Sequence, residues 1–94
     1  MDKIQKQFRI TGRVQGVGFR HFTRQNAREL SISGWVKNLK NGDVEALLEG
    51  DVERVDEMTN RLKSGPVAAR VDGIREVEKN YESDKPFEGF TVKR

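Results

Sequence analysis

The segment Gly12–Arg20 marks the point at which the apolar pattern of this chain changes from the period of a strand to the period of a helix. Up to its first residues, Phe8, Ile10, Gly12 and Val14 alternate with polar residues, which is typical of a strand with one buried face. After it, apolar residues recur at helical spacing over about residues 19–31, which predicts an amphipathic helix. The chain must therefore pass from strand to helix through a glycine-containing turn.

That turn has the composition of an anion-binding site. Gly16 and Gly18 tolerate positive φ and carry no Cβ, so the chain between them can curl until successive N–H groups point at one spot. The helix that follows adds unpaired first-turn N–H groups, and Arg20 adds a planar charged fork that matches two phosphate oxygens. Taken alone, the same pattern is also typical of an ordinary strand-to-helix connection with a solvated arginine, and both interpretations stay open here.

The remaining elements predict a two-layer α+β fold. We expect strands at Gly34–Leu39 and Asp43–Glu49, a helix between Asp51 and Gly65, a strand at Val71–Tyr81 and a short strand at Phe90–Val92 after a loop at Pro86. The pair Asn41-Gly42 favours a type I′ hairpin turn, and Asp51 is expected to cap the second helix. This order predicts a ferredoxin-like βαββαβ sandwich, an antiparallel sheet with two helices on one face, with the last strand as an addition.

Length and composition limit the class of protein. The 94 residues predict one domain, 1–94, and the absence of cysteine excludes a disulfide framework and a thiolate metal site. We find no signal peptide and no apolar run long enough to span a membrane, so we expect a cytoplasmic protein and, at this size, a monomer. The net charge of +3, with a basic first third and an acidic middle, favours a small anionic partner near the glycine turn.

Asn38 is the polar residue that we expect to approach this turn. In the predicted topology the first and central strands lie side by side, which would bring Asn38 to the loop from a neighbouring strand. A carboxamide can donate to a phosphoryl oxygen and accept from a water, so it could hold a nucleophile in line with a P–O bond. The spacing is equally typical of a polar residue beside a hairpin, and composition does not decide between the two.

Two segments together resemble the signatures of the acylphosphatase family. These are Gly12-Arg13-Val14-Gln15-Gly16-Val17-Gly18-Phe19-Arg20 and Gly34-Trp35-Val36-Lys37-Asn38 followed by Asn41-Gly42-Asp43-Val44-Glu45. The resemblance implies metal-independent hydrolysis of a carboxyl-phosphate anhydride to a carboxylate and inorganic phosphate, with no cofactor. By position, it implies that Arg20 binds the phosphoryl group and that Asn38 orients the attacking water. The backbone amides of Gln15, Gly16, Val17, Gly18 and Phe19 would form the phosphate cradle.

Other side chains and other classes of function are weaker candidates. The only histidine, His21, points about 100° away from Arg20 around the helix, so we expect it at a solvated rim rather than as a proton carrier. Asn26 is expected at a wet rim of the same helix, with a functional hydrogen bond as the alternative. Few metal ligands are available, and the turn lacks the Gly-Lys-Ser/Thr ending of a nucleotide-binding loop.

Two non-catalytic alternatives remain at this point. An RNA-binding module of the same fold would expose aromatic residues on its central strands, whereas Val44–Leu48 carries none. A domain that only binds carbamoyl phosphate would form part of a longer protein. We therefore expect an enzyme acting on a small acyl phosphate, with no specific nucleic acid and no membrane as partner. The acyl group of that substrate is not determined by the sequence.

Overall fold

The structure is a computed structural model that describes residues 3–78 and 87–94. Within these residues the chain forms β1 (Lys3–Arg13), α1 (Phe19–Glu29), β2 (Ser33–Asn38), β3 (Val44–Asp51), α2 (Val52–Ser64), β4 (Arg70–Val77) and β5 (Phe90–Val92). The first strand begins earlier than the apolar alternation predicts, because Lys3–Gln7 pair with the far end of β3. The predicted strand Val71–Tyr81 is described only to Val77, and Tyr81 and Pro86 lie outside the described residues.

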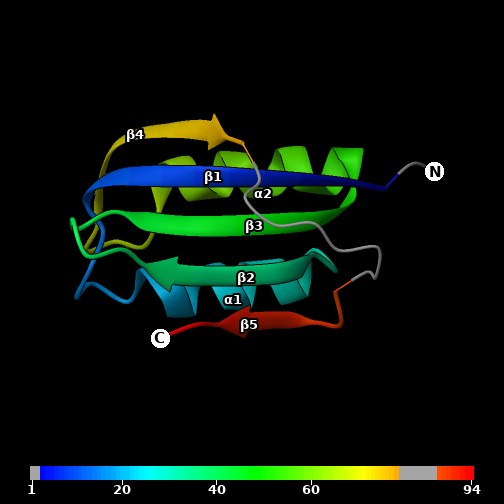
Figure 1. Cartoon of the computed structure of the whole chain (residues 1–94), viewed down its shortest axis with the longest axis horizontal. Helices are drawn as coiled ribbons and strands as arrows, with labels where there is room; N and C mark the ends of the chain where they lie inside the picture. Colours follow the sequence, from blue (N-terminus) through cyan, green and yellow to red (C-terminus); the bar gives the residue numbers. More distant parts are fainter. Residues whose placement is uncertain (1–2, 79–86) are drawn as a thin grey trace.

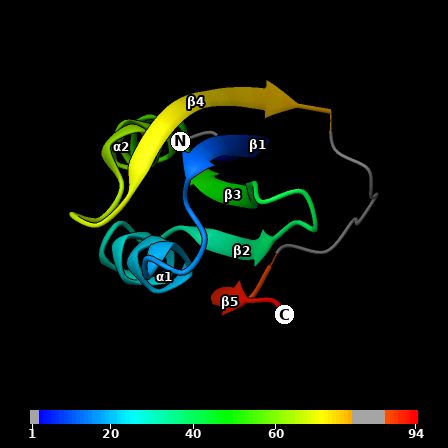
Figure 2. The same ribbon diagram turned by 90° about the vertical axis from the view of Figure 1, so that its left-hand side faces the viewer.

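The strands form a single sheet in the order β4-β1-β3-β2-β5, and both helices cover the same face of it (Figures 1 and 2). This is the α+β, ferredoxin-like architecture that the element order predicts. The four strands of the βαββαβ unit pair antiparallel, as predicted, and the added strand β5 runs parallel to β2 at the edge. In this position β5 buries Phe90, which pairs with Gly34 of β2, and its direction takes the chain end toward the start of α1 (Figure 1).

The core lies between the sheet and the two helices. The sheet contributes alternate residues of each strand, among them Phe8, Ile10, Val36, Val44, Ala46 and Leu48. Phe19 and Ala27 of α1 and Val55, Met58 and Leu62 of α2 meet them at helical spacing. The stripe of Val55, Met58 and Leu62 is therefore core packing, as its spacing predicts.

The first helix ends two residues before the predicted limit, at Glu29. Ser31 has φ 56°, and the N–H of Ile32 donates to the carbonyl of Ala27 at 2.7 Å while that of Ser31 donates to Arg28 at 3.2 Å. These are the two hydrogen bonds of a Schellman motif. A serine occupies the left-handed position where glycine is the usual residue, so the sequence carried no clear stop signal.

Two local predictions are corrected by the backbone. The turn between β2 and β3 is not type I′, because Gly42 has positive φ whereas Asn41 does not. The N–H of Leu39 donates to Asp43 and the N–H of Gly42 donates to Leu39, which makes a three-residue turn. Asp51 stands at the N-cap of α2, but its side chain makes no capping hydrogen bond and instead lies 3.9 Å from Nε of Arg54.

Candidate active site

The connection from β1 to α1 has the backbone that the glycine spacing predicts. Gly16 and Gly18 have φ of 73° and 80°, a region that side chains with a Cβ rarely adopt. Gly18 is the N-cap residue of α1, no side chain caps the helix, and its first turn contains no acidic residue. In the part of the chain that the structure describes, the N–H groups at the start of α1 therefore have no capping side chain, and no acidic residue of the first turn compensates the positive end of the helix dipole.

Arg20 lies in the first turn of α1 and is half-buried. Its Nη1 donates a hydrogen bond of 3.3 Å to the carbonyl of Lys93, the residue that follows β5. Among the described residues no carboxylate forms an ion pair with this guanidinium. One edge of the guanidinium is thus held by a backbone carbonyl, while no carboxylate of residues 3–78 and 87–94 pairs with its positive charge.

Asn38 is the last residue of β2, and its side chain lies on the helix-covered face because it follows Val36 by two residues. The expectation that a strand adjacent to β1 carries it is wrong, since β3 lies between β1 and β2. Asn38 nevertheless meets the turn, because the chain leaving β1 crosses to α1 on the β2 side of the sheet (Figure 2). Its Oδ1 is buried, and no donor in residues 3–78 and 87–94 reaches it.

These groups line one open hollow of about 860 Å³ at the start of α1. The lining residues come from the turn, α1, the end of β2 and the chain after β5: Val14, Gly16, Gly18, Phe19, Arg20, His21, Arg24, Asn38, Val92 and Arg94. Most of the residues predicted for the site are therefore brought together. Gln15 and Val17 are not among the lining residues, and Val17 packs against the core instead.

The side chain of Gln15 makes a contact that the sequence did not indicate. Its Nε2 donates to the carbonyls of Leu39 at 2.7 Å and Asp43 at 2.8 Å, both in the turn between β2 and β3. The side chain thus connects the glycine turn to the residue directly after Asn38. No local pattern could have revealed this contact, because it joins residues 24 and 28 positions apart.

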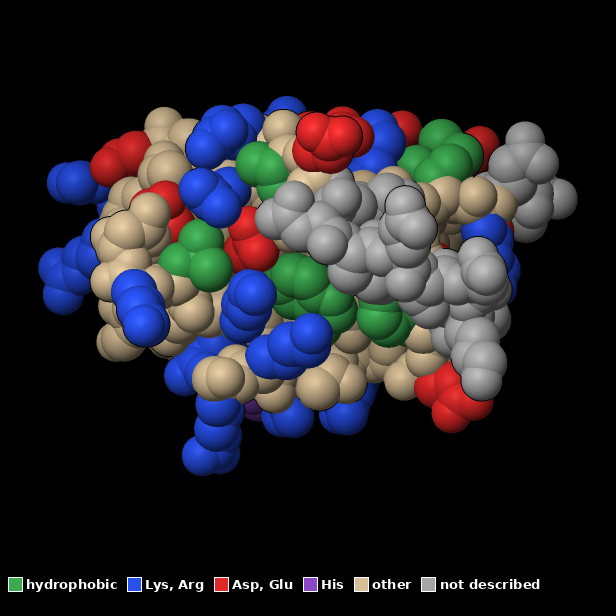
Figure 3. Space-filling model, in the orientation of Figure 1, with side chains coloured by type: hydrophobic (Ala, Val, Ile, Leu, Met, Phe, Trp, Pro, Cys, Tyr) green, Lys and Arg blue, Asp and Glu red, His purple; other side chains and the backbone are tan. Residues whose placement is uncertain are grey.

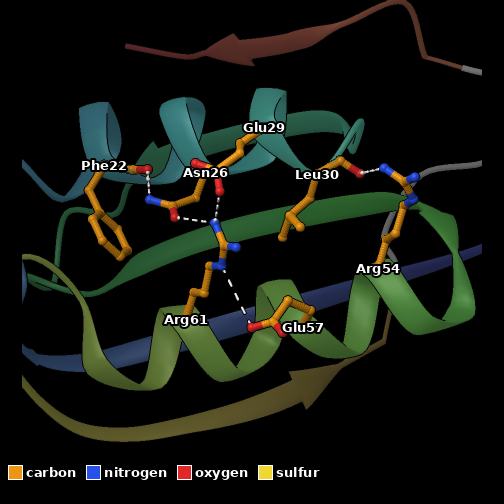
Figure 4. A network of polar contacts seen from close by, with 7 residues as sticks. All are labelled: Phe22, Asn26, Glu29, Leu30, Arg54, Glu57 and Arg61. Carbon is orange, nitrogen blue, oxygen red and sulfur yellow. Dashed lines mark hydrogen bonds and ion pairs between the residues drawn. The ribbon is translucent and has the colours of Figure 1, made fainter.

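His21 and Asn26 occupy different places on α1. His21 is exposed at the edge of the hollow, as its place on the helix predicts. Asn26 faces α2: its Nδ2 donates to the carbonyl of Phe22 at 2.8 Å, and its Oδ1 accepts from Nη1 of Arg61 at 2.9 Å (Figure 4). Arg61 also pairs with Glu29 at 3.0 Å, so Asn26 belongs to a polar link between the helices, not to the hollow.

Two features are absent from the residues that the structure describes. No group of three histidine, aspartate or glutamate side chains that could hold a metal ion is present in them. Neither described helix is long and apolar enough to cross a membrane.

Comparison with known proteins identifies the family. The acylphosphatase family model matches residues 6–92. An acylphosphatase of Thermococcus kodakarensis is 46% identical over 92 residues, which cover 98% of each chain. The structure of an acylphosphatase from Coxiella burnetii superposes with a TM-score of 0.87 at 35% identity, covering 98% of this chain and 94% of that one. The structure of T. kodakarensis HypF matches with a TM-score of 0.81 at 30% identity, over 97% of this chain but only 12% of that protein. The chain therefore belongs to the acylphosphatase family, whose members hydrolyse acyl phosphates.

Proposed function

We propose that Arg20 binds the phosphoryl group of the acyl phosphate and that Asn38 orients the water that attacks it, without a metal ion. The observation that carries this proposal is the meeting, in one hollow, of three groups: a guanidinium without a carboxylate partner among the described residues, a left-handed glycine turn at a helix N-terminus, and a carboxamide oxygen that no described donor reaches. Each of these groups favours a partner that is either an anion or a hydrogen-bond donor.

The phosphoryl group would lie against the backbone amides of Gln15 to Phe19. The curl at Gly16 and Gly18 and the uncapped first turn of α1 support this placement. Arg20 would bind two phosphoryl oxygens with the edge of its guanidinium that Lys93 does not hold. In phosphoryl transfer the charge spreads over the equatorial oxygens, so fixed N–H donors and a cation stabilise the transition state directly.

Asn38 would hold the nucleophile. A water that donates to Oδ1 of Asn38 would satisfy an acceptor that has no partner among the described residues, while Nδ2 could donate to a phosphoryl oxygen. The water oxygen forms the new P–O bond as the bond between phosphorus and the acyl oxygen breaks, and the carboxylate leaves with that electron pair. The proton of the water passes to a phosphoryl oxygen of the substrate, so no protein base is required.

The test is hydrolysis of benzoyl phosphate by the wild-type chain with EDTA present, measured beside Arg20→Lys. We expect full activity of the wild type in EDTA and near-complete loss in the variant, because a point charge does not reproduce the planar fork. Loss of wild-type activity in EDTA would contradict metal independence. Undiminished activity of Arg20→Lys would contradict the role given to this residue.

The structure does not favour the RNA-binding alternative. On the face of the sheet that the helices leave open, basic and acidic side chains are interspersed (Figure 3). Trp35 lies on this face but is only 5% exposed, with Nζ of Lys93 and Lys37 4.5 and 5.1 Å from its ring centre. Its ring is thus largely covered, whereas base stacking needs an open ring face. That residues 1–94 act as one domain, and as a cytoplasmic monomer, stays a prediction.

A further inference from the structure

The half-buried arginines of the described residues divide into two pairs. Arg9 lies 3.1 Å from Glu45, and Arg61 lies 3.0 Å from Glu29, so each has a carboxylate partner. Arg20 and Arg24 are also half-buried, yet no carboxylate in the described chain pairs with either. Removing a cation from water is unfavourable unless an anion accompanies it. The phosphoryl group of the substrate is expected to pair with Arg20. Arg24 then still has no anionic partner among the described residues.

Arg24 lies one helical turn after Arg20 on the same side of α1, and both side chains line the same hollow. Arg94 lines it as well, and it directly follows Lys93, whose carbonyl holds Arg20. No acidic residue is among the described residues that line this hollow. The hollow therefore holds a second half-buried arginine, Arg24, with which no described carboxylate pairs.

The spacing limits what this second arginine can bind. Arg24 is five residues after Phe19, where α1 begins, so its backbone is displaced by about 7.5 Å along the helix axis. A phosphoryl group at the helix N-terminus would already have Arg20 and the amides of the turn as partners, so the guanidinium of Arg24, which starts one helical turn farther along α1, is the group left for a second anion. A longer substrate with anionic groups at both ends would contact both arginines.

We infer that Arg24 and Arg94 form a subsite for a second anion, carried by the acyl group of the substrate. The preferred substrates are then acyl phosphates whose acyl part ends in a carboxylate or a phosphate, rather than acyl phosphates with an uncharged acyl group. This inference rests on the proposed function of the hollow. It adds a preference for one kind of leaving group, the acyl part of the substrate. The proposed phosphate cradle and Asn38 would not contact that part.

The experiment compares two substrates that differ only in this charge: 3-carboxybenzoyl phosphate and its neutral isostere 3-carbamoylbenzoyl phosphate. The rigid ring prevents the second group from attacking the anhydride intramolecularly. Each kcat/KM is divided by the rate of spontaneous hydrolysis, which corrects for the reactivity of the leaving group. We expect the wild type to prefer the carboxylate by roughly fivefold at low ionic strength, and the preference to shrink as salt is added.

The variants Arg24→Gln and Arg94→Gln test whether these two arginines cause the preference for the carboxylate substrate. Each is expected to lower the ratio of the two kcat/KM values, and the double variant to bring it to about one. Arg28→Gln is the matched control, because Arg28 is an exposed arginine of the same helix that does not line the hollow. Its ratio should equal that of the wild type. Since Arg94 is exposed, its variant tests the subsite even if Arg24→Gln folds poorly.

Three results would overturn the inference. The first is a wild-type ratio of one or below. The second is an equal fall for both substrates in Arg24→Gln, which would put Arg24 on the phosphoryl group. The third is an unchanged ratio in the double variant. If the wild type hydrolysed neither substrate nor benzoyl phosphate, the proposed function itself would fail, and this result is distinguishable from the other three.

Discussion

The carboxamide of Gln15 donates a hydrogen bond of 2.7 Å to the carbonyl of Leu39, the residue that directly follows Asn38. Through this bond the turn that would bind phosphate and the strand end that would hold water are joined by a side chain as well as by the sheet. The distance between these two groups decides whether a water can attack in line with the scissile bond. We therefore expect the side chain of Gln15 to act by positioning, because it binds the turn between β2 and β3 and does not line the hollow.

We expect Gln15→Ala to lower kcat by roughly tenfold or more while the dissociation constant for inorganic phosphate changes little, since misplacement of catalytic groups affects the chemical step. Stability should fall by only about 1 kcal/mol. The carbonyls of Leu39 and Asp43 keep backbone donors, namely the N–H groups of Gly42 and Leu39. Steady-state kinetics, phosphate titration and urea unfolding measure the three quantities. Equal loss of phosphate binding and kcat would contradict a positioning role.

Arg20→Lys should lower kcat/KM for benzoyl phosphate by roughly 10²-fold or more, because one ammonium replaces a bidentate, preorganised donor pair. Its stability should change little, since the described contacts of Arg20 amount to one hydrogen bond of 3.3 Å to Lys93. Arg28→Lys serves as the control on the same helix. A comparable loss of activity in the control would show that the effect arises from α1 and not from the site.

Asn38→Ala separates activity from stability. Its turnover should fall by roughly 10²-fold, as when a preorganised polar group is removed from an active site. Its free energy of unfolding should stay the same or rise, because Oδ1 of Asn38 is buried and no described donor reaches it. The urea midpoint and the phosphate dissociation constant are measured on the same preparation. A variant that keeps its turnover but loses phosphate would reverse the roles assigned to Arg20 and Asn38.

Gly34→Ala should destabilise the fold by about 3 kcal/mol or more, because it combines a strained conformation with a steric clash. Gly34 has φ 135°, and a Cβ there would overlap the carbonyl of Leu47 on the neighbouring strand. Gly42→Ala is the matched control: φ is 98°, but a Cβ would meet nothing within 4 Å. Its cost should be about 1 kcal/mol, from backbone strain alone. Chemical denaturation of both variants tests this difference, and equal costs would contradict the steric explanation.

Asn26→Ala should lower the free energy of unfolding by about 1 to 2 kcal/mol, because it removes one hydrogen-bond acceptor of the half-buried Arg61. The kcat for benzoyl phosphate should stay within a factor of two. The acceptor is Oδ1 of Asn26, which receives a hydrogen bond from Arg61 across the two helices. Urea unfolding and steady-state kinetics give both numbers. A large fall in kcat with unchanged stability would mean that Asn26 acts on the site after all.

The features of this protein that can be predicted from its sequence are local. The change of apolar period, the positive-φ glycines at positions 16 and 18 and the arginine two residues later predict a strand, a turn and a helix that suit an anion, because each depends on neighbours a few positions away. The predicted topology brought Asn38 toward this turn, and the resemblance of two short motifs gave it the role of orienting water. The Schellman end of α1 at Ser31 was missed, since serine carries no strong signal for the left-handed conformation.

The contacts between distant parts of the chain depend on the tertiary fold. The parallel placement of β5 beside β2 brings the carbonyl of Lys93 to Arg20, 73 residues away in the sequence. The order of the strands places β3 between β1 and β2. Asn38 therefore meets the glycine turn only because the chain crosses from β1 to α1 on the side of β2. Gln15 then joins that turn to the hairpin between β2 and β3. Such contacts result from the burial of one common core between the sheet and its helices. The free energy of this burial depends on the whole chain, so no local sequence pattern predicts it.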